Sequence, residues 1–145
     1  MGDILISAII GYGLGQLSPA AFLSKIKKVD LRKTGTGNLG ATNTAIVFGK
    51  ISGIIVLLLD VFKAFFAIKL AKMMLPEFTY AGLIAGCFAI VGHIFPLYLK
   101  FRGGKGVATL AGMVLAYDIR VVLFLLVLAA LIMWLTNTGH YGPLS

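Results

Sequence analysis

The chain is too apolar and too weakly charged for an ordinary soluble domain. Of its 145 residues, 59% are hydrophobic and 12% are charged, and the mean hydropathy is +1.00, whereas soluble domains are about 45–50% apolar and about 25% charged. The net charge of +8 would suit nucleic acid, but no basic stripe with interleaved aromatic residues is present, so we expect no nucleic-acid partner. The sequence predicts an all-α, polytopic transmembrane protein.

The first predicted span covers residues 4–23. It has about the 20 apolar residues that a helix needs to cross a bilayer. It lacks the basic region and the small-residue cleavage site of a signal peptide. Its glycines favour close helix contact, and the dipeptide Ser18-Pro19 predicts a kink.

A basic, glycine-rich loop follows this span. The sequence GTGNLG at residues 35–40 formally matches the dinucleotide fingerprint G-x-G-x-x-G, but that fingerprint requires a preceding strand and a βαβ unit, which we do not expect here. The glycines still let backbone N–H groups approach a ligand closely, and Asn38 and Asn43 add polar groups beside them. The alternative is a flexible connector.

Two more spans are predicted at residues 51–71 and 79–99. Asp60 and Lys63 lie within the first of these, and their i, i+3 spacing allows them to neutralise each other. An unpaired charge within a span costs at least about 2.5–3.5 kcal/mol, so the two residues form either a structural ion pair or part of a binding site. His93, near the end of the other span, is either a hydrogen-bonding scaffold or a catalytic residue. No second histidine or carboxylate lies at metal-ligand spacing, so we expect no metal.

A second glycine-rich loop, FRGGKGVAT at residues 101–109, leads directly into a helical run. Helix N-termini bind anions through unpaired N–H groups and a partial positive charge. Successive glycines can form a concave nest of N–H groups, to which Arg102 and Lys105 add full charges. The spacing of a Walker A loop is absent. We predict a phosphate cradle here, and the alternative is a basic anchor with a helix cap.

The rest of the chain predicts two shorter elements. Residues 107–117 are expected to form a half-helix at the membrane surface, and residues 119–135 a fourth, short span. Residues 140–145 resemble a loop that enters a further span. Cys87, alone in an apolar run, is expected to be buried and unpaired.

The distribution of basic residues predicts the orientation. Lys25, Lys27, Lys28, Arg32, Lys33 and Lys50 lie between the first two spans, and Lys100, Arg102 and Lys105 follow the third. Cytoplasmic loops carry the excess of lysine and arginine. We therefore expect the N-terminus outside the cell and both glycine-rich loops at the cytoplasmic face.

Three motifs occur in one order along the chain. Asp30-Leu31-Arg32 precedes GTGNLGATN at residues 35–43, DVFK follows at residues 60–63, and GHIFP at residues 92–96 precedes the second glycine-rich loop. Together they resemble the bacterial acyl-phosphate:glycerol-3-phosphate acyltransferases, the PlsY family. The resemblance covers most of the chain.

The resemblance implies a bacterial inner-membrane enzyme of phospholipid biosynthesis that works without a cofactor. Such an enzyme transfers a fatty acyl group from acyl phosphate to the 1-hydroxyl of glycerol 3-phosphate, giving lysophosphatidate and phosphate. The resemblance implies Thr36, His93 and Lys105 as catalytic residues. The substrate-binding residues that it implies are Asn38, Gly40, Asn43, Lys63, Gly103, Gly104, Gly106 and Thr109. His93 would orient these groups or help to deprotonate the hydroxyl, although a phosphate oxygen of the donor can also take that proton.

Four departures from the family pattern stand out. Thr36 replaces the usual serine, Ile46 the usual arginine and Ala64 the usual glycine, and the chain ends before the C-terminal motif of the family. Residues 1–145 are therefore expected to be a single, incomplete membrane domain with weak or no acyltransferase activity. The alternatives are an inactive truncated relative, or a non-enzymatic membrane protein that binds or conducts phosphate or anionic lipid. The sequence does not predict the acyl-chain preference or the oligomeric state.

Overall fold

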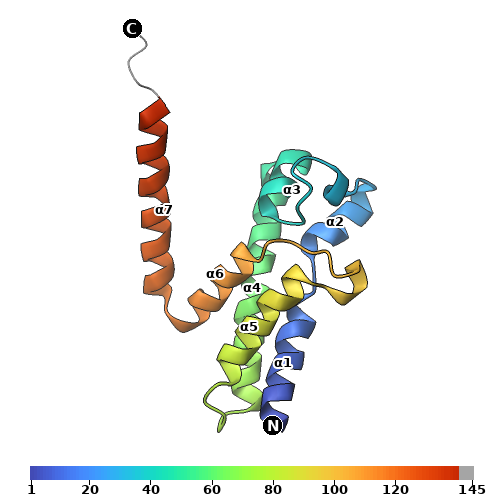
Figure 1. Ribbon diagram of the computed structural model, residues 1–145, viewed down its shortest axis with the longest axis vertical. Coiled ribbons are helices and arrows are strands. Elements are labelled where there is room, and N and C mark those ends of the chain that lie inside the picture. Colours follow the sequence, from blue (N-terminus) through green and yellow to red (C-terminus); the bar gives the residue numbers. More distant parts are fainter. Residues whose placement is uncertain (141–145) are drawn as a thin grey trace.

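The computed structural model describes residues 1–140, and every regular element in them is a helix. The elements are α1 (Gly2–Gly15), α2 (Pro19–Lys27), η1 (Leu31–Lys33), α3 (Ala41–Phe48), α4 (Lys50–Met74), α5 (Ala81–Ile94), η2 (Leu97–Leu99), α6 (Val107–Tyr117) and α7 (Ile119–His140) (Figure 1). The η elements are single 3-10 turns. The predicted all-α class is confirmed for these residues, while most of the loop expected at residues 140–145 lies outside them.

Three segments of the described chain are long and apolar enough to cross a membrane: Gly2–Lys27, Lys50–Met74 and Ala81–Leu99. They correspond to the first three predicted spans. In α7, the described apolar stretch Ile119–Ile132 is shorter, but the helix continues to His140, past the predicted end at residue 135.

The kink predicted in the first span is confirmed. α1 ends at Gly15, and α2 begins at Pro19 in a new direction. Ser18 has an extended backbone, and its side-chain oxygen accepts a hydrogen bond from the N–H of Ala21 at 3.1 Å. A serine N-cap followed by proline is a favoured helix start because proline lacks the N–H that the first turn would leave unpaired.

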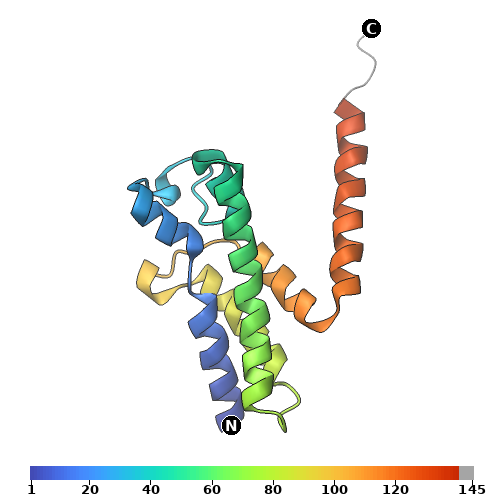
Figure 2. The ribbon, with the colours of Figure 1, turned by 180° about the vertical axis from the view of Figure 1, so that it is seen from behind.

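Helices α1, α4 and α5 form a tight bundle, which Figures 1 and 2 show from opposite sides. A Cβ added at Gly11 or Gly15 of α1 would collide with the backbone of Ala85 or Ala89 in α5. Ala64 and Ala67 of α4 are fully buried in the same bundle. Because lipid is as apolar as these helices, small residues that permit close packing hold such bundles together.

The two last helices differ in how they pack. α6 lies against α4, where a Cβ added at Gly112 would collide with the backbone of Val61. The bounds of α6 are those predicted, and its expected place at the membrane surface stays a prediction. α7 stands apart from the bundle in both views and contacts mainly α6.

The expectation that Cys87 is buried is wrong, because the cysteine is exposed on α5. The buried face of this helix carries the small residues Gly82, Ala85, Gly86 and Ala89. Cys87 falls on a different face of the helix, which the hydropathy of a membrane span cannot distinguish from the buried one.

Candidate active site

The first glycine-rich loop is organised by the fully buried side chain of Asn43, at the start of α3. Its Oδ1 accepts a hydrogen bond from the N–H of Thr36 at 2.8 Å. Its Nδ2 donates to the carbonyl oxygens of Leu31, Thr34 and Asn38 at 2.9, 2.9 and 3.0 Å. An amide has two N–H donors, so these contacts use the whole donor capacity of Asn43. The Asn43 side chain therefore fixes the backbone conformation of the first glycine-rich loop.

The polar groups of this loop differ in accessibility. Thr36 is exposed, and its Oγ1 accepts a long hydrogen bond of 3.4 Å from the N–H of Asn38, which is half-buried. Gly40 is buried at the N-cap of α3, where its carbonyl oxygen accepts from the N–H and the hydroxyl of Thr44. Thr36 and Asn38 are thus the predicted residues that this loop offers to a ligand.

The second glycine-rich loop folds back onto the end of α5. The N–H groups of Gly103 and Gly104 donate to the carbonyl oxygens of Ile94 and His93 at 2.9 and 3.2 Å. These two N–H groups therefore terminate α5 and are not free to bind phosphate. A Cβ at Gly103 would collide with the backbone of His93, so the absence of a side chain is what permits this return of the chain.

The remaining donors for an anion lie where this loop enters α6. Gly106 is the N-cap of α6 with φ of +83°, a conformation that favours glycine. The N–H groups in the first turn of a helix have no partner within the helix, and they carry partial positive charge. Lys105 is exposed next to them, whereas Thr109 is fully buried and its Oγ1 has no hydrogen-bond partner among the described residues.

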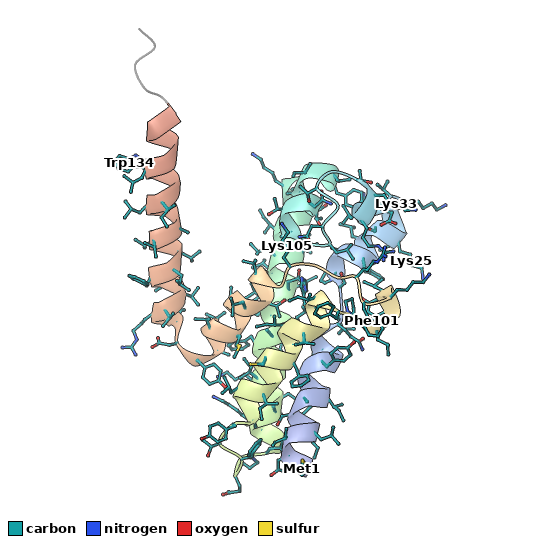
Figure 3. All side chains as sticks on the ribbon, in the orientation of Figure 1. Met1, Lys25, Lys33, Phe101, Lys105 and Trp134 are labelled. Carbon is teal, nitrogen blue, oxygen red and sulfur yellow. The ribbon has the colours of Figure 1, made fainter. Side chains whose placement is uncertain are left out.

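The two loops cross at Gly104. A Cβ at this position would collide with Nε2 of His93 and with the carbonyl oxygen of Leu39, which belongs to the first loop. A second tie joins the same regions, since the guanidinium of Arg32 donates to the carbonyl oxygen of Leu99 at 3.4 Å. The structure thus brings the two loops together with His93 beneath their crossing. Figure 3 shows Lys25, Lys33 and Lys105 toward the end of the bundle opposite Met1, and Phe101 nearer its middle.

A buried polar cluster lies below this crossing, between α4 and α5. Lys63 Nζ lies 2.8 Å from Asp60 Oδ1, 2.7 Å from His93 Nδ1 and 2.9 Å from the carbonyl oxygen of Leu17. Asp60 is 1% exposed, and the other two side chains of the cluster are buried. The contact with Asp60 has the distance of an ion pair but not the angles of a hydrogen bond. The predicted pairing of Asp60 with Lys63 is confirmed.

An apolar groove of about 1200 Å³ opens beside this cluster, between α2 and α4. Lys63 is one of its lining residues, so the groove reaches the buried polar cluster. Its apolar walls include Phe22 of α2, Ile55 and Leu59 of α4, and Leu99 of η2. Such a shape suits a hydrocarbon chain whose polar end lies near Lys63.

The charges at the mouth of the groove are partly compensated. Arg32 lowers the pKa of Asp30, chiefly because its backbone N–H donates to the carboxylate, and its guanidinium adds attraction. Asp30 is therefore ionised at neutral pH and offsets one of the basic residues. Lys25 and Lys28 also line the groove.

Sequence reasoning missed three features of this site. It did not predict the contact of His93 with Lys63, the internal role of Asn43, or the place of the Leu39 carbonyl at the crossing. The only sequence signal for the contact of His93 with Lys63 is the position of Lys63 within a predicted span, where a charged side chain needs polar partners. Within the described chain, no group of three His, Cys, Asp or Glu residues is placed to hold a metal ion.

The chain matches the protein family described as "Glycerol-3-phosphate acyltransferase" over residues 5–144. A relative from Staphylococcus carnosus, named glycerol-3-phosphate acyltransferase, is 38% identical over 150 residues, which cover 98% of this chain and 73% of the relative.

Two solved structures are also similar. They are crystal structures of PlsY (YgiH), an integral membrane glycerol 3-phosphate acyltransferase. The glycerol 3-phosphate form is 36% identical with a TM-score of 0.81, and the lysophosphatidic acid form is 35% identical with a TM-score of 0.79. The matches cover 90% of this chain, and 66% and 65% of the PlsY chains respectively.

Proposed function

The chain belongs to the glycerol-3-phosphate acyltransferase family, and we propose that it transfers the acyl group of an acyl phosphate to glycerol 3-phosphate. The hydroxyl oxygen of glycerol 3-phosphate forms a bond to the acyl carbon, and the bond from that carbon to the phosphate oxygen breaks. The hydroxyl proton leaves with the phosphate. The products are lysophosphatidate and inorganic phosphate, and the membrane fold gives the lipid product direct access to the bilayer.

The observation that carries this proposal is the crossing of the two loops over His93, next to an apolar groove that Leu39 and Lys63 line. Both substrates of the reaction carry phosphate, and one carries a hydrocarbon chain. The site offers basic and N–H groups for the former and the groove for the latter. Because phosphate is a good leaving group, the protein has mainly to align the substrates and stabilise charge.

We assign the residues of the second loop to phosphate. Lys105 and the N–H groups at the start of α6 form the anion site, which Gly106 makes accessible. Thr36 and Asn38 of the first loop orient the second head group. His93 contacts the reacting groups at the crossing of the two loops. Asn43 holds the first loop in place, and Gly103 and Gly104 hold the second.

We also propose an orientation. The two loops lie toward the end of the bundle opposite Met1, and lysine and arginine concentrate in cytoplasmic loops. The N-terminus is then outside the cell and the site faces the cytoplasm. After removal of Cys87, a cysteine introduced at Thr36 should react with a membrane-impermeant reagent only from the cytoplasmic side, and one at Glu77 only from outside. Labelling of position 36 from outside would contradict the orientation.

The activity is tested with palmitoyl phosphate in lipid nanodiscs. Phosphate release that depends on glycerol 3-phosphate, together with formation of lysophosphatidate, is the expected result. The rate should be lower than that of the Staphylococcus carnosus relative, because Ile46 stands where the family resemblance implies an arginine. A His93→Ala variant is the matched control for contaminating hydrolases. Binding of glycerol 3-phosphate without turnover, under conditions in which the Staphylococcus carnosus relative turns over, would favour a binding protein instead.

A further inference from the structure

The two ring nitrogens of His93 lie in different surroundings. Nδ1 is 2.7 Å from Lys63 Nζ and 3.5 Å from Asp60 Oδ1, inside the buried cluster. Nε2 lies on the other side of the ring, beneath Gly104 and close to the carbonyl oxygen of Leu39, at the crossing of the loops. In the described chain, no protein group forms a hydrogen bond with Nε2.

The charge of Lys63 decides which nitrogen carries the proton. A lysine ammonium can donate hydrogen bonds but cannot accept them. Asp60 lies 2.8 Å from this ammonium and balances its charge within the buried cluster. Since Nδ1 is at hydrogen-bond distance from the ammonium, Nδ1 must be the acceptor, and the proton of the neutral ring is on Nε2.

The ammonium of Lys63 is directed toward protein groups, although the side chain also lines the groove. The carbonyl oxygen of Leu17, Nδ1 of His93 and the carboxylate of Asp60 surround the ammonium on three sides. Lys63 was expected to bind substrate directly. Its contacts instead direct its charge and its donors toward groups of the protein.

We propose that Asp60 and Lys63 are positioning residues, which hold His93 as the Nε2–H tautomer so that it donates a hydrogen bond to a substrate oxygen at the loop crossing. This rests on the acyl transfer proposed above. His93 is then a donor that stabilises the developing charge, and it does not remove the proton of the attacking hydroxyl. That proton passes to an oxygen of the departing phosphate, as in the transfer proposed above.

The tautomer can be measured without any turnover. The chain contains two histidines, so a His140→Asn variant leaves His93 as the single imidazole. In nitrogen-15 spectra of this variant in nanodiscs, long-range couplings to the ring protons identify the protonated nitrogen. We expect protonated Nε2 and unprotonated Nδ1. A ring protonated at Nδ1 would overturn the proposal, whether or not the protein is active.

Variants test what holds the tautomer. Asp60→Asn removes the countercharge of Lys63, and Lys63→Met removes the donor to Nδ1. Both substitutions should give either a mixture of the two His93 tautomers or mainly the Nδ1–H tautomer. Asp60→Glu should keep the Nε2–H tautomer of the parent protein. Asp118→Asn is the matched control, because it neutralises a carboxylate that pairs with Arg120 far from the site. Unchanged tautomers in folded Asp60→Asn and Lys63→Met would overturn the proposal.

Kinetics then separate positioning from a general effect on folding. Loss of a charge-assisted hydrogen bond lowers the rate by about tenfold to a hundredfold. We expect Asp60→Asn to lower kcat by this factor with little change in the KM for glycerol 3-phosphate, and His93→Phe to do the same. If Asp60 acts through His93, Asp60→Asn should have almost no effect in the His93→Phe background. Fully multiplicative effects of the two substitutions would show that Asp60 does not act through His93.

Discussion

The two glycine-rich loops of this protein use glycine for different physical reasons. In the first loop, Gly35 and Gly37 have φ of +60° and +78°, and one buried amide, that of Asn43, fixes the path of the chain. In the second loop, Gly103 and Gly104 lie so close to His93 that no side chain fits. The first loop therefore depends on a side chain that is present, and the second on side chains that are absent.

The two loops therefore contribute to the site in different ways. The first loop is self-contained, because most of its hydrogen bonds lie between residues 30 and 44. The second loop is attached to α5 by its backbone N–H groups and so follows the position of His93. Substitutions in the two loops should accordingly differ in the size and the kind of their effects.

The largest effect is expected for Gly104→Ala. The new Cβ would overlap Nε2 of His93 and the backbone of Leu39, so the loops must separate at their crossing. A displacement of about 1 Å at a reacting centre can lower the rate about a hundredfold. Steady-state turnover measures this. Gly13→Ala is the control, because its Cβ would meet no atom within 4 Å. Parent activity in Gly104→Ala would show that the crossing is not part of the site.

Asn43→Ala should come next. It removes the acceptor of the Thr36 N–H and the side-chain donor of three carbonyl oxygens, of which those of Leu31 and Thr34 keep a backbone donor. An unpaired buried polar group costs about 1–3 kcal/mol. We expect a lower melting temperature in detergent and a loss of turnover of about tenfold or more. Thr42→Ala, at an exposed neighbouring position, should change neither. If Asn43→Ala lowers activity without any loss of stability, the amide acts on substrate and not on the loop.

Lys105→Ala tests the charge that the second loop supplies. Removal of one charge-assisted contact, worth about 1.5–3 kcal/mol, should weaken binding of glycerol 3-phosphate or of acyl phosphate by about tenfold to a hundredfold. Stability should not change, since Lys105 is exposed. Isothermal titration in nanodiscs measures the affinity. Lys33→Ala, an exposed charge of the first loop, is the control, and equal losses in both variants would indicate a general electrostatic effect.

The smallest effect is expected at Thr36. Its hydroxyl makes one long hydrogen bond within the first loop and is exposed. A neutral hydrogen bond contributes about 0.5–1.5 kcal/mol, so Thr36→Val should lower turnover by about twofold to tenfold. Thr36→Ser retains the hydroxyl and should keep parent activity. A loss of about a hundredfold or more in Thr36→Val would mean that this hydroxyl contacts the reacting atoms.

Much of the fold could be predicted from the sequence. The three long apolar segments, the kink at Pro19, the bounds of α6 and the pairing of Asp60 with Lys63 all follow from local rules. Hydropathy measures whether a segment prefers lipid, proline acts on its own helix, and i, i+3 spacing places two side chains on one helix face. The two glycine-rich loops were identified in the same way, from composition and from the helix that follows each of them.

The roles of particular residues were decided by the tertiary structure. Lys63 and His93 are 30 residues apart, yet their side chains lie 2.7 Å apart because α4 packs against α5. The same packing turns Cys87 outward and directs Nε2 of His93 to the loop crossing. Composition and spacing determine which residues carry charge, donors or flexibility. Which partner satisfies each donor depends on distances across helices, and those distances are set only when small residues let the helices approach one another.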